Sequence, residues 1–140
     1  MKAVQQNVAG AGAGNAPPRR ISIVDDDVSI REALKGLMRS AGFDAEAFAS
    51  AEDFLTSDSL SDTSCLILDV TLPGMNGFEL QNRLQAEGRG IPIVFITAHA
   101  DEASRQRALK GGAIEFLSKP VRWEPLFNAI EAAISSKPGE

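Results

Sequence analysis

The chain has 140 residues, 44% of them hydrophobic, which is enough for one globular domain with a buried core. Its formal net charge of -5 argues against direct binding of nucleic acid, and no apolar run approaches the length of a membrane span. The single cysteine, Cys65, excludes an internal disulfide, and with no apolar secretory signal at the N-terminus the sequence favours a cytoplasmic protein.

The N-terminal segment differs from the rest of the chain. Residues 1–18 are rich in Gly, Ala and Asn, show neither a helical nor a strand period, and end in Pro17 and Pro18. This composition predicts a flexible tail. We therefore expect one folded domain over residues 19–137.

The folded part begins with a short strand and a helix. Residues 21–24 form a β-rich run, and over residues 30–41 apolar side chains recur at helical spacing. Ser29 with Glu32 predicts a capping box at the start of this helix, and Gly42 predicts its end.

Strands and helices then alternate to the end of the domain. The expected elements are a weak strand at 43–48, a short helix at 50–55 led by Ser50, a buried strand at 65–70, a loop at 72–77, a helix at 78–86, a buried strand at 91–97, a polar helix at 101–112, a strand at 113–120 and a closing helix at 124–134. Five strands alternating with five helices predict a parallel sheet covered on both faces.

Two strand orders satisfy right-handed connections, the flavodoxin-like order 2-1-3-4-5 and a Rossmann-like half. In either order, chemistry belongs at the carboxyl ends of the strands, by the switch point. The residues at these ends are Asp25, Asp26 and Asp27 for the first strand, Asp69 for the third, Thr97 for the fourth and Lys119 for the fifth.

Consecutive carboxylates repel one another, so their clustering needs a reason. In the flavodoxin-like order the first and third strands are neighbours, which brings Asp25 and Asp26 against Asp69. A carboxylate cluster open to water suits Mg²⁺, which prefers oxygen ligands and removes the repulsion. The alternative is that these residues only cap the first helix, and we expect Asp27 to do little more than that.

Lys119 and Thr97 extend this hypothesis to phosphoryl chemistry. An ammonium and a hydroxyl can each bind one oxygen of a phosphoryl group while Mg²⁺ takes a third. Phosphoryl transfer depends mainly on such positioning and charge neutralisation. Asp69 can then be the nucleophile, because carboxylates form acyl phosphates.

With these residues in place, the sequence resembles the receiver domain of bacterial two-component response regulators, in the CheY-like superfamily. The resemblance covers residues 20–135 and rests on the blocks IVDDD, LILDVTLPGMNGFEL, IPIVFITAHAD and KGGAIEFLSKP, in order and at familiar spacing. It is strongest to receivers of the FixJ type, which head two-domain transcription factors. It implies the flavodoxin-like (βα)5 fold with strand order 2-1-3-4-5.

The resemblance also implies how the site works. Asp69 would be the phosphoacceptor and would take its phosphoryl group from a sensor histidine kinase or a phosphotransfer protein. Asp25, Asp26 and Asp69, with the backbone carbonyl of Thr71, would bind Mg²⁺. Lys119 would pair with the phosphoryl group after a cis bond to the following proline.

Four residues would respond to phosphorylation or control its lifetime. Thr97 would move toward the phosphoryl group, and Phe116 falls at the switch aromatic position. Thr71 and His99 would tune the rate of dephosphorylation. The helix at 101–112, the strand at 113–120 and the helix at 124–134 would form the altered partner surface, which is also the candidate homodimer interface. The domain would catalyse only its own phosphorylation and dephosphorylation and would regulate an output such as transcription.

Two other functions fit the sequence less well. A Mg²⁺-dependent phosphatase that forms an aspartyl phosphate usually carries a second Asp two residues after the nucleophile, where this chain has Thr71, and a cap domain for which the chain has no length. A flavodoxin-like cofactor binder would cradle a phosphate in the loop after the first strand, and the acidic run at 25–27 would repel it.

Overall fold

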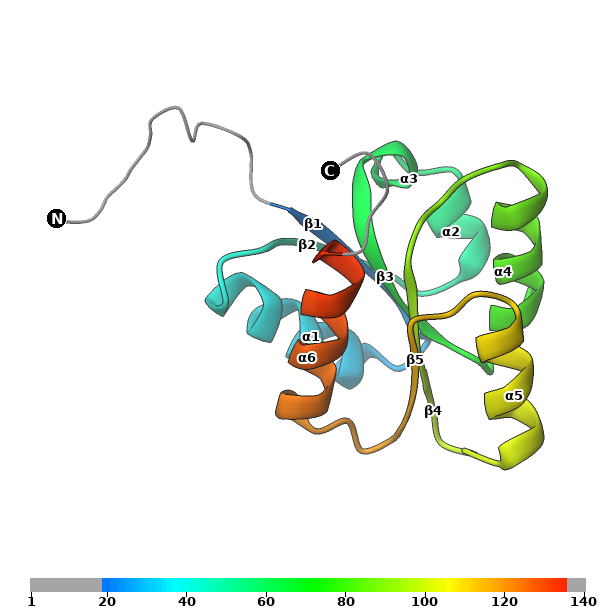
Figure 1. Cartoon of the computed structure of the whole chain (residues 1–140). Coiled ribbons are helices and arrows are strands. Elements are labelled where there is room, and N and C mark those ends of the chain that lie inside the picture. The colour runs from blue at the N-terminus through cyan, green and yellow to red at the C-terminus, as the bar shows by residue number, and fades with distance from the viewer. Residues whose placement is uncertain (1–18, 136–140) are drawn as a thin grey trace, which may run out of the picture.

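Five parallel strands form the centre of the structure, in the order β2-β1-β3-β4-β5 (Figure 1). They are β1 (Arg20–Val24), β2 (Asp44–Phe48), β3 (Thr63–Asp69), β4 (Ile93–Thr97) and β5 (Glu115–Ser118). This order confirms the flavodoxin-like prediction and excludes the Rossmann-like half. The computed structural model describes residues 19–135, so the predicted tail at 1–18 and the predicted end of the domain at 136–137 lie outside the described residues.

Six helical segments connect or follow the strands. They are α1 (Val28–Ser40), α2 (Ala51–Leu55), α3 (Ser59–Asp62), α4 (Gly77–Ala86), α5 (Glu102–Lys110) and α6 (Trp123–Ser135). The prediction of five helices was one short, because α3 is a single turn of four residues and too brief to show a helical period. The predicted helices at 101–112 and 124–134 correspond to α5 and α6.

Helices cover both faces of the sheet, with α1 and α6 on one face and α2, α4 and α5 on the other (Figure 1). Because side chains alternate along a strand, each strand contributes to two separate cores. On β3, for example, Cys65 and Ile67 pack toward α1 and α6, whereas Leu66 and Leu68 pack toward the opposite face. All seven residues of β3 are buried, as expected for the central strand of a parallel sheet.

The start of α1 differs from the prediction. Asp27 is its N-cap, and the Asp27 carboxylate accepts the backbone N–H groups of Ser29 and Ile30 at 2.8 and 3.3 Å. The predicted capping box of Ser29 and Glu32 is therefore wrong, because the carboxylate two residues earlier already binds the free N–H groups of the first turn. Gly42 follows the C-cap with a φ of 96°, which fits its predicted role in ending the helix.

The carboxyl ends of the strands lie at one edge of the sheet, and the loops that leave them carry the candidate site residues. Over residues 19–135, no helix combines the length and the apolar character that crossing a membrane requires.

Candidate functional site

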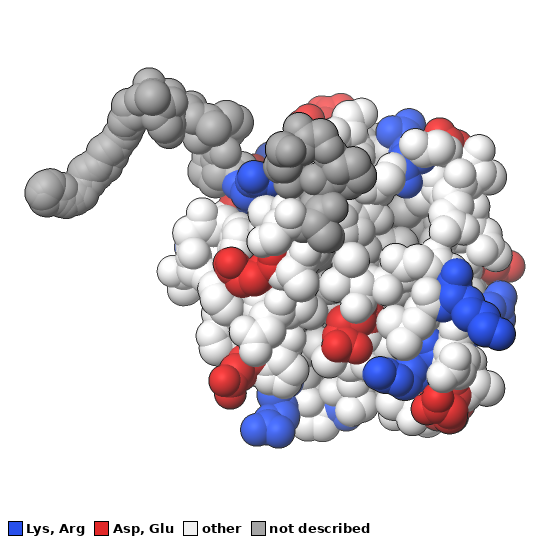
Figure 2. Space-filling view, viewed as in Figure 1, with Lys and Arg blue, Asp and Glu red and all other residues white. Residues whose placement is uncertain are grey.

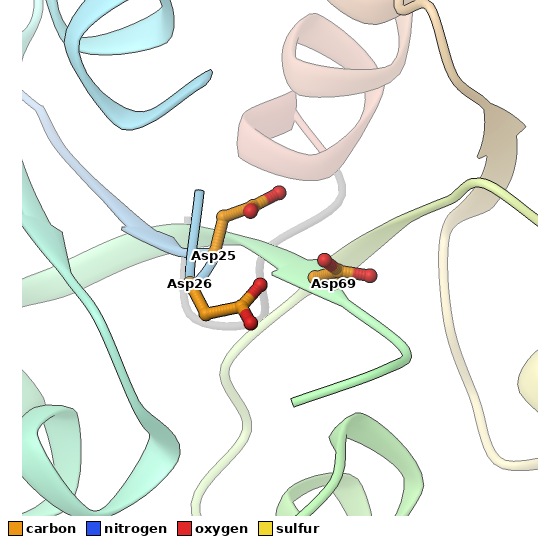
Figure 3. Close-up of side chains that lie close together, drawn as sticks. All are labelled: Asp25, Asp26 and Asp69. Carbon is orange, nitrogen blue, oxygen red and sulfur yellow. The ribbon is translucent and has the colours of Figure 1, made fainter. Parts of the chain in front are cut away.

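Three carboxylates meet where β1 and β3 end (Figure 3). Asp25 and Asp26 follow β1, and Asp69 is the last residue of the neighbouring strand β3. One carboxylate oxygen from each residue lies within 4.8 Å of the other two. Asp25 and Asp69 are 0% and 4% exposed, whereas Asp26 is open to solvent. The fold thus brings together the acidic residues that the sequence separates by more than forty positions.

Backbone contacts fix Asp25 at the end of β1. Its backbone N–H donates to the carbonyl of Phe48 at 3.1 Å, and its carboxylate Oδ1 accepts the N–H of Asp27 at 2.9 Å. The guanidinium of Arg31, in α1, donates to the carbonyl of Asp25 at 2.8 Å. Both the main chain and the side chain of Asp25 are therefore held in one orientation.

Lys119 joins the two buried carboxylates. Its Nζ donates to Oδ2 of Asp69 at 2.9 Å and lies 2.9 Å from Oδ2 of Asp25. The contact with Asp25 is an ion pair without hydrogen-bond alignment, and this Oδ2 is the one buried side-chain polar atom within residues 19–135 that lacks a hydrogen bond. The backbone N–H of Lys119 donates to the carbonyl of Thr97 at 2.7 Å, and the bond to Pro120 is cis.

Burial and neighbouring charges shift the pKa values of this group. Burial raises the pKa of the Asp69 carboxyl, the hydrogen bond from Lys119 opposes this, and the charge of Asp25 raises it again, leaving the pKa above its ordinary value. Burial lowers the pKa of Lys119, but its contacts with Asp25 and Asp69 outweigh burial and leave the pKa raised. Lys119 is therefore a cation at neutral pH.

The donor set suits a hard divalent cation. The three clustered side chains offer only carboxylate oxygens, and Asp25 keeps one buried oxygen without a hydrogen bond. Opposite oxygens in an octahedral Mg²⁺ site lie about 4.2 Å apart, twice a bond length of about 2.1 Å. Oxygens that already lie within 4.8 Å of one another need only small shifts to reach such a site, and the exposed Asp26 is free to make them. The residues present therefore fit Mg²⁺.

Thr71 contacts the central carboxylate through its backbone. Its N–H donates to Oδ1 of Asp69 at 3.1 Å, while its side chain is exposed. With Lys119 on Oδ2 and Thr71 on Oδ1, both oxygens of Asp69 have a hydrogen-bond donor.

Thr97, His99 and Phe116 lie around the site without a hydrogen bond to Asp69 in the described part of the chain. Thr97 is buried at the end of β4, and its Oγ1 accepts the backbone N–H of His99 at 3.0 Å, so the hydroxyl is engaged locally. The residue His99 is exposed. Phe116 is 5% exposed and packs against Phe95 with ring centroids 6.3 Å apart, so its ring points into the core.

Two side chains that support the site were not predicted from the sequence. The guanidinium of Arg31 donates to the carbonyl of Asp25. Glu52, in α2, accepts the backbone N–H of Met75, in the loop after β3, at 2.9 Å. The sequence does not show which distant backbone group a charged side chain near a helix start will contact. Only the folded structure reveals these two hydrogen bonds.

Residues 21–131 match the family model described as the response regulator receiver domain. Nodulation protein W of Bradyrhizobium diazoefficiens is 47% identical over 113 residues, which are 81% of this chain and 50% of that protein. Transcriptional regulatory protein FixJ of the same organism is 38% identical over 114 residues, 81% of this chain and 56% of its own.

A solved structure of response regulator StyR is similar in fold and sequence. It superimposes with a TM-score of 0.78 at 49% identity, over 84% of this chain and 60% of its own. The chain spans about half the length of the curated relatives that it matches.

Proposed function

This chain belongs to the family of response regulator receiver domains, and from that premise we propose that it is a phosphorylation-switched receiver with Asp69 as its phosphoacceptor. Receiver domains are signalling regulators of two-component systems. The observation that carries the proposal is the Lys119 ammonium, 2.9 Å from both Asp69 and Asp25, beside a carboxylate cluster that fits a divalent cation. A cation on each side of Asp69 is the arrangement that phosphoryl transfer needs.

In the proposed reaction, a carboxylate oxygen of Asp69 attacks the phosphorus of a phosphohistidine. The new oxygen–phosphorus bond forms as the phosphorus–nitrogen bond breaks, and the imidazole of the donor keeps the electron pair and takes up a proton. The donor would be a sensor histidine kinase or a phosphotransfer protein. The domain would catalyse this transfer and the later hydrolysis of its own acyl phosphate, and no other reaction.

The residues that would hold Mg²⁺ are Asp25, Asp26 and Asp69, with the backbone carbonyl of Thr71. The bound ion would neutralise charge on the transferred group. Lys119 would bind a phosphoryl oxygen once Asp69 is phosphorylated, since it already donates to Asp69.

Phosphorylation would shift the domain between two arrangements. The hydroxyl of Thr97 accepts the N–H of His99, and its own proton stays available to donate to a phosphoryl oxygen. Phe116 lies beneath the same edge of the sheet, in β5 next to β4, and its buried ring would move with Thr97. The result would be an altered surface over α5, β5 and α6.

An intact-mass measurement tests the phosphoacceptor. Incubation with acetyl phosphate and Mg²⁺ should add one phosphoryl group to the parent chain and none to Asp69→Asn. Asp26→Ala should slow the labelling by weakening Mg²⁺ binding, because Asp26 is the exposed ligand. Full labelling of Asp69→Asn would reject the assignment.

The phosphodonor protein would dock beside Lys119. An apolar groove runs between α1 and the segment after β5, and it is lined by Ile30, Ala33, Leu34, Leu37, Lys119, Pro120 and Val121. The exposed large hydrophobic side chains of the described chain are Val28, Leu37 and Trp123, at 59%, 42% and 39%, all on α1 or at the start of α6. Lys119 belongs both to this groove and to the Asp69 contact, so a partner seated there lies beside the phosphoacceptor.

Leu37→Ser separates docking from chemistry. We expect it to slow phosphotransfer from a phosphorylated histidine protein by roughly tenfold, because a central apolar anchor contributes about 1–2 kcal/mol to binding. Labelling by acetyl phosphate should stay at the parent rate. Equal slowing of both reactions would place the defect in the site and reject docking in the groove.

The surface over α5, β5 and α6 is the proposed homodimer interface. Figure 2 shows uncharged residues over much of the surface between α6 and α5, with Lys and Arg gathered over α5. A shallow groove between β5 and α6 is lined by Ile114, Glu115, Pro125, Asn128, Ala129 and Ala132. Sedimentation velocity should show self-association on phosphorylation in the parent and not in Ala132→Arg. A phosphorylated Ala132→Arg that dimerises normally would exclude this face.

The domain would act in the cytoplasm, where a kinase can reach it, and this chain would not itself contact nucleic acid. Its relatives include proteins named as transcriptional regulators, so the proposed output is control of transcription.

A further inference from the structure

The loop that leaves the proposed phosphoacceptor is anchored at both ends. At its start, the N–H of Val70 donates to the carbonyl of Ile96 at 3.1 Å, and Thr71 donates to Asp69. At its end, Asn76 and Glu79 form a reciprocal capping box at the start of α4. Leu72, 7% exposed, packs into the core between these ends.

The exposed apex of this loop has a single polar anchor. Of Pro73, Gly74 and Met75, only Met75 makes a hydrogen bond within residues 19–135, and its N–H donates to Oε2 of Glu52 at 2.9 Å. Pro followed by Gly with a φ of 70° is the sequence of a type II turn. In such a turn the fourth residue often donates back to the first, but here the Met75 N–H is donated to a side chain of α2 instead.

Glu52 is well placed to hold the apex still. It lies in the first turn of α2, which is fixed by the fully buried Ala51 and Phe54 and capped by Ser50. The hydrogen bond from Met75 lowers the pKa of the Glu52 carboxyl, so the acceptor is ionised at neutral pH. A Cβ on Gly74 would lie 2.7 Å from Oε2 of Glu52, so a methyl group there would displace this carboxylate.

We propose that Glu52 is a positioning residue for the metal and phosphorylation site: through Met75 it fixes the loop that carries Thr71. This inference rests on the proposed function, because the loop would affect the site through the carbonyl of Thr71, a proposed metal ligand beside Asp69. Glu52 is exposed, so its hydrogen bond adds little to global stability. The hydrogen bond instead sets the fraction of molecules whose loop is positioned to bind Mg²⁺. The apparent Mg²⁺ affinity falls in proportion to that fraction.

The test is a Mg²⁺ titration of the ¹⁵N-labelled protein, followed by the amide resonances of residues 69–71, with hydrogen exchange of the Met75 amide measured without metal. Glu52→Ala should weaken Mg²⁺ binding about threefold or more, as expected if the competent loop falls to about a third of molecules. The Met75 amide should exchange about tenfold faster. The urea midpoint should stay close to that of the parent.

Two controls separate the hydrogen bond from charge. Glu52→Gln removes the charge and keeps an acceptor oxygen, so it should bind Mg²⁺ within about twofold of the parent. Asp53→Ala removes an equal charge from the next position of α2, where the carboxylate makes no hydrogen bond among the described residues, and should also bind normally. Equal weakening by Glu52→Gln and Glu52→Ala would show that long-range charge is responsible and would overturn the proposal.

A pair of glycine variants tests the contact from the other side. Gly74 and Gly88 have φ values of 70° and 71°, so alanine costs similar backbone strain at both. A Cβ at Gly74 meets Glu52, whereas one at Gly88 has nothing within 4 Å. Gly74→Ala should therefore weaken Mg²⁺ binding as Glu52→Ala does, and Gly88→Ala should not.

The outcomes distinguish this inference from the function on which it rests. If the parent binds Mg²⁺, Asp26→Ala loses it and Glu52→Ala binds like the parent, the positioning role alone is overturned. If the parent does not bind Mg²⁺, the proposed function is overturned and the positioning role with it.

Discussion

Gly77 is the position where one added methyl group should disturb both the fold and the site. It is the first residue of α4, and its N–H donates to the carbonyl of Val70 at 2.9 Å. A Cβ there would collide with the backbone carbonyl oxygen of Asp69 and lie 3.0 Å from Cα of Val70 and 3.1 Å from Cε1 of Phe95. Two of these neighbours are backbone atoms of the segment that carries the proposed phosphoacceptor, so they cannot rotate away.

The expected cost of Gly77→Ala follows from these contacts. Overpacking of a well-packed site costs about 1–3 kcal/mol, and the better helix propensity of alanine returns about 0.5–1 kcal/mol. The midpoints of these ranges leave a net loss of unfolding free energy of about 1 kcal/mol, which lowers the Tm of a domain of this size by roughly 4 °C. Because Asp69 must shift, labelling by acetyl phosphate should slow as well.

Urea unfolding followed by circular dichroism measures the change, and Gly36 is its control. Gly36 lies in α1, is exposed, and a Cβ there would have nothing within 4 Å. Gly36→Ala should therefore stabilise the protein by about 0.5–1 kcal/mol. If Gly77→Ala gains stability as Gly36→Ala does, the close approach of α4 to the end of β3 is not a constraint and the reasoning fails.

Asp69→Asn should be more stable than the parent at pH 7. The pKa of Asp69 is higher in the folded than in the unfolded state, so the parent loses stability as pH rises from the unfolded to the folded pKa. Equal urea midpoints of the two proteins at pH 7 would contradict this. Mg²⁺ at a hundred times its Kd should raise the unfolding free energy of the parent by about 2.7 kcal/mol, and the Tm with it. The Tm of Asp26→Ala should stay nearly unchanged, and an equal gain in both proteins would exclude Asp26 as a ligand. Thr71→Ala and His99→Ala should change the decay rate of the phosphorylated protein by more than about twofold, or roughly 0.4 kcal/mol of barrier, and should still be labelled. Decay at the parent rate in both variants and in the double variant would reject their tuning role.

The strand ends were predictable because short apolar runs stop at residues with distinctive chemistry. Asp69 and Thr97 are the last residues of β3 and β4, and Lys119 directly follows β5, so sequence order and the parallel-sheet rule place them at one edge. The two-core architecture was likewise implied by strands without polar alternation.

The sequence could not show which carboxylates are buried and which are exposed. Asp25 and Asp26 are adjacent and chemically identical, yet one is fully buried against Lys119 and the other is exposed. That difference depends on the path of the chain after β1 and on a lysine more than ninety residues away. Single contacts such as Glu52 with Met75 are invisible for the same reason, because they depend on how a loop passes a helix.

The core between the sheet and the helices α1 and α6 has a consequence for synthesis on the ribosome. Leu34 and Met38 from the first helix share that core with Leu126 and Ile130 from the last. The opposite core needs only segments up to Phe116, so it can close before α6 is made. The nascent chain should therefore carry α1 with its apolar side uncovered until the final helix leaves the exit tunnel, and a chain released before Trp123 should be cut by protease within α1 while its α4 remains protected.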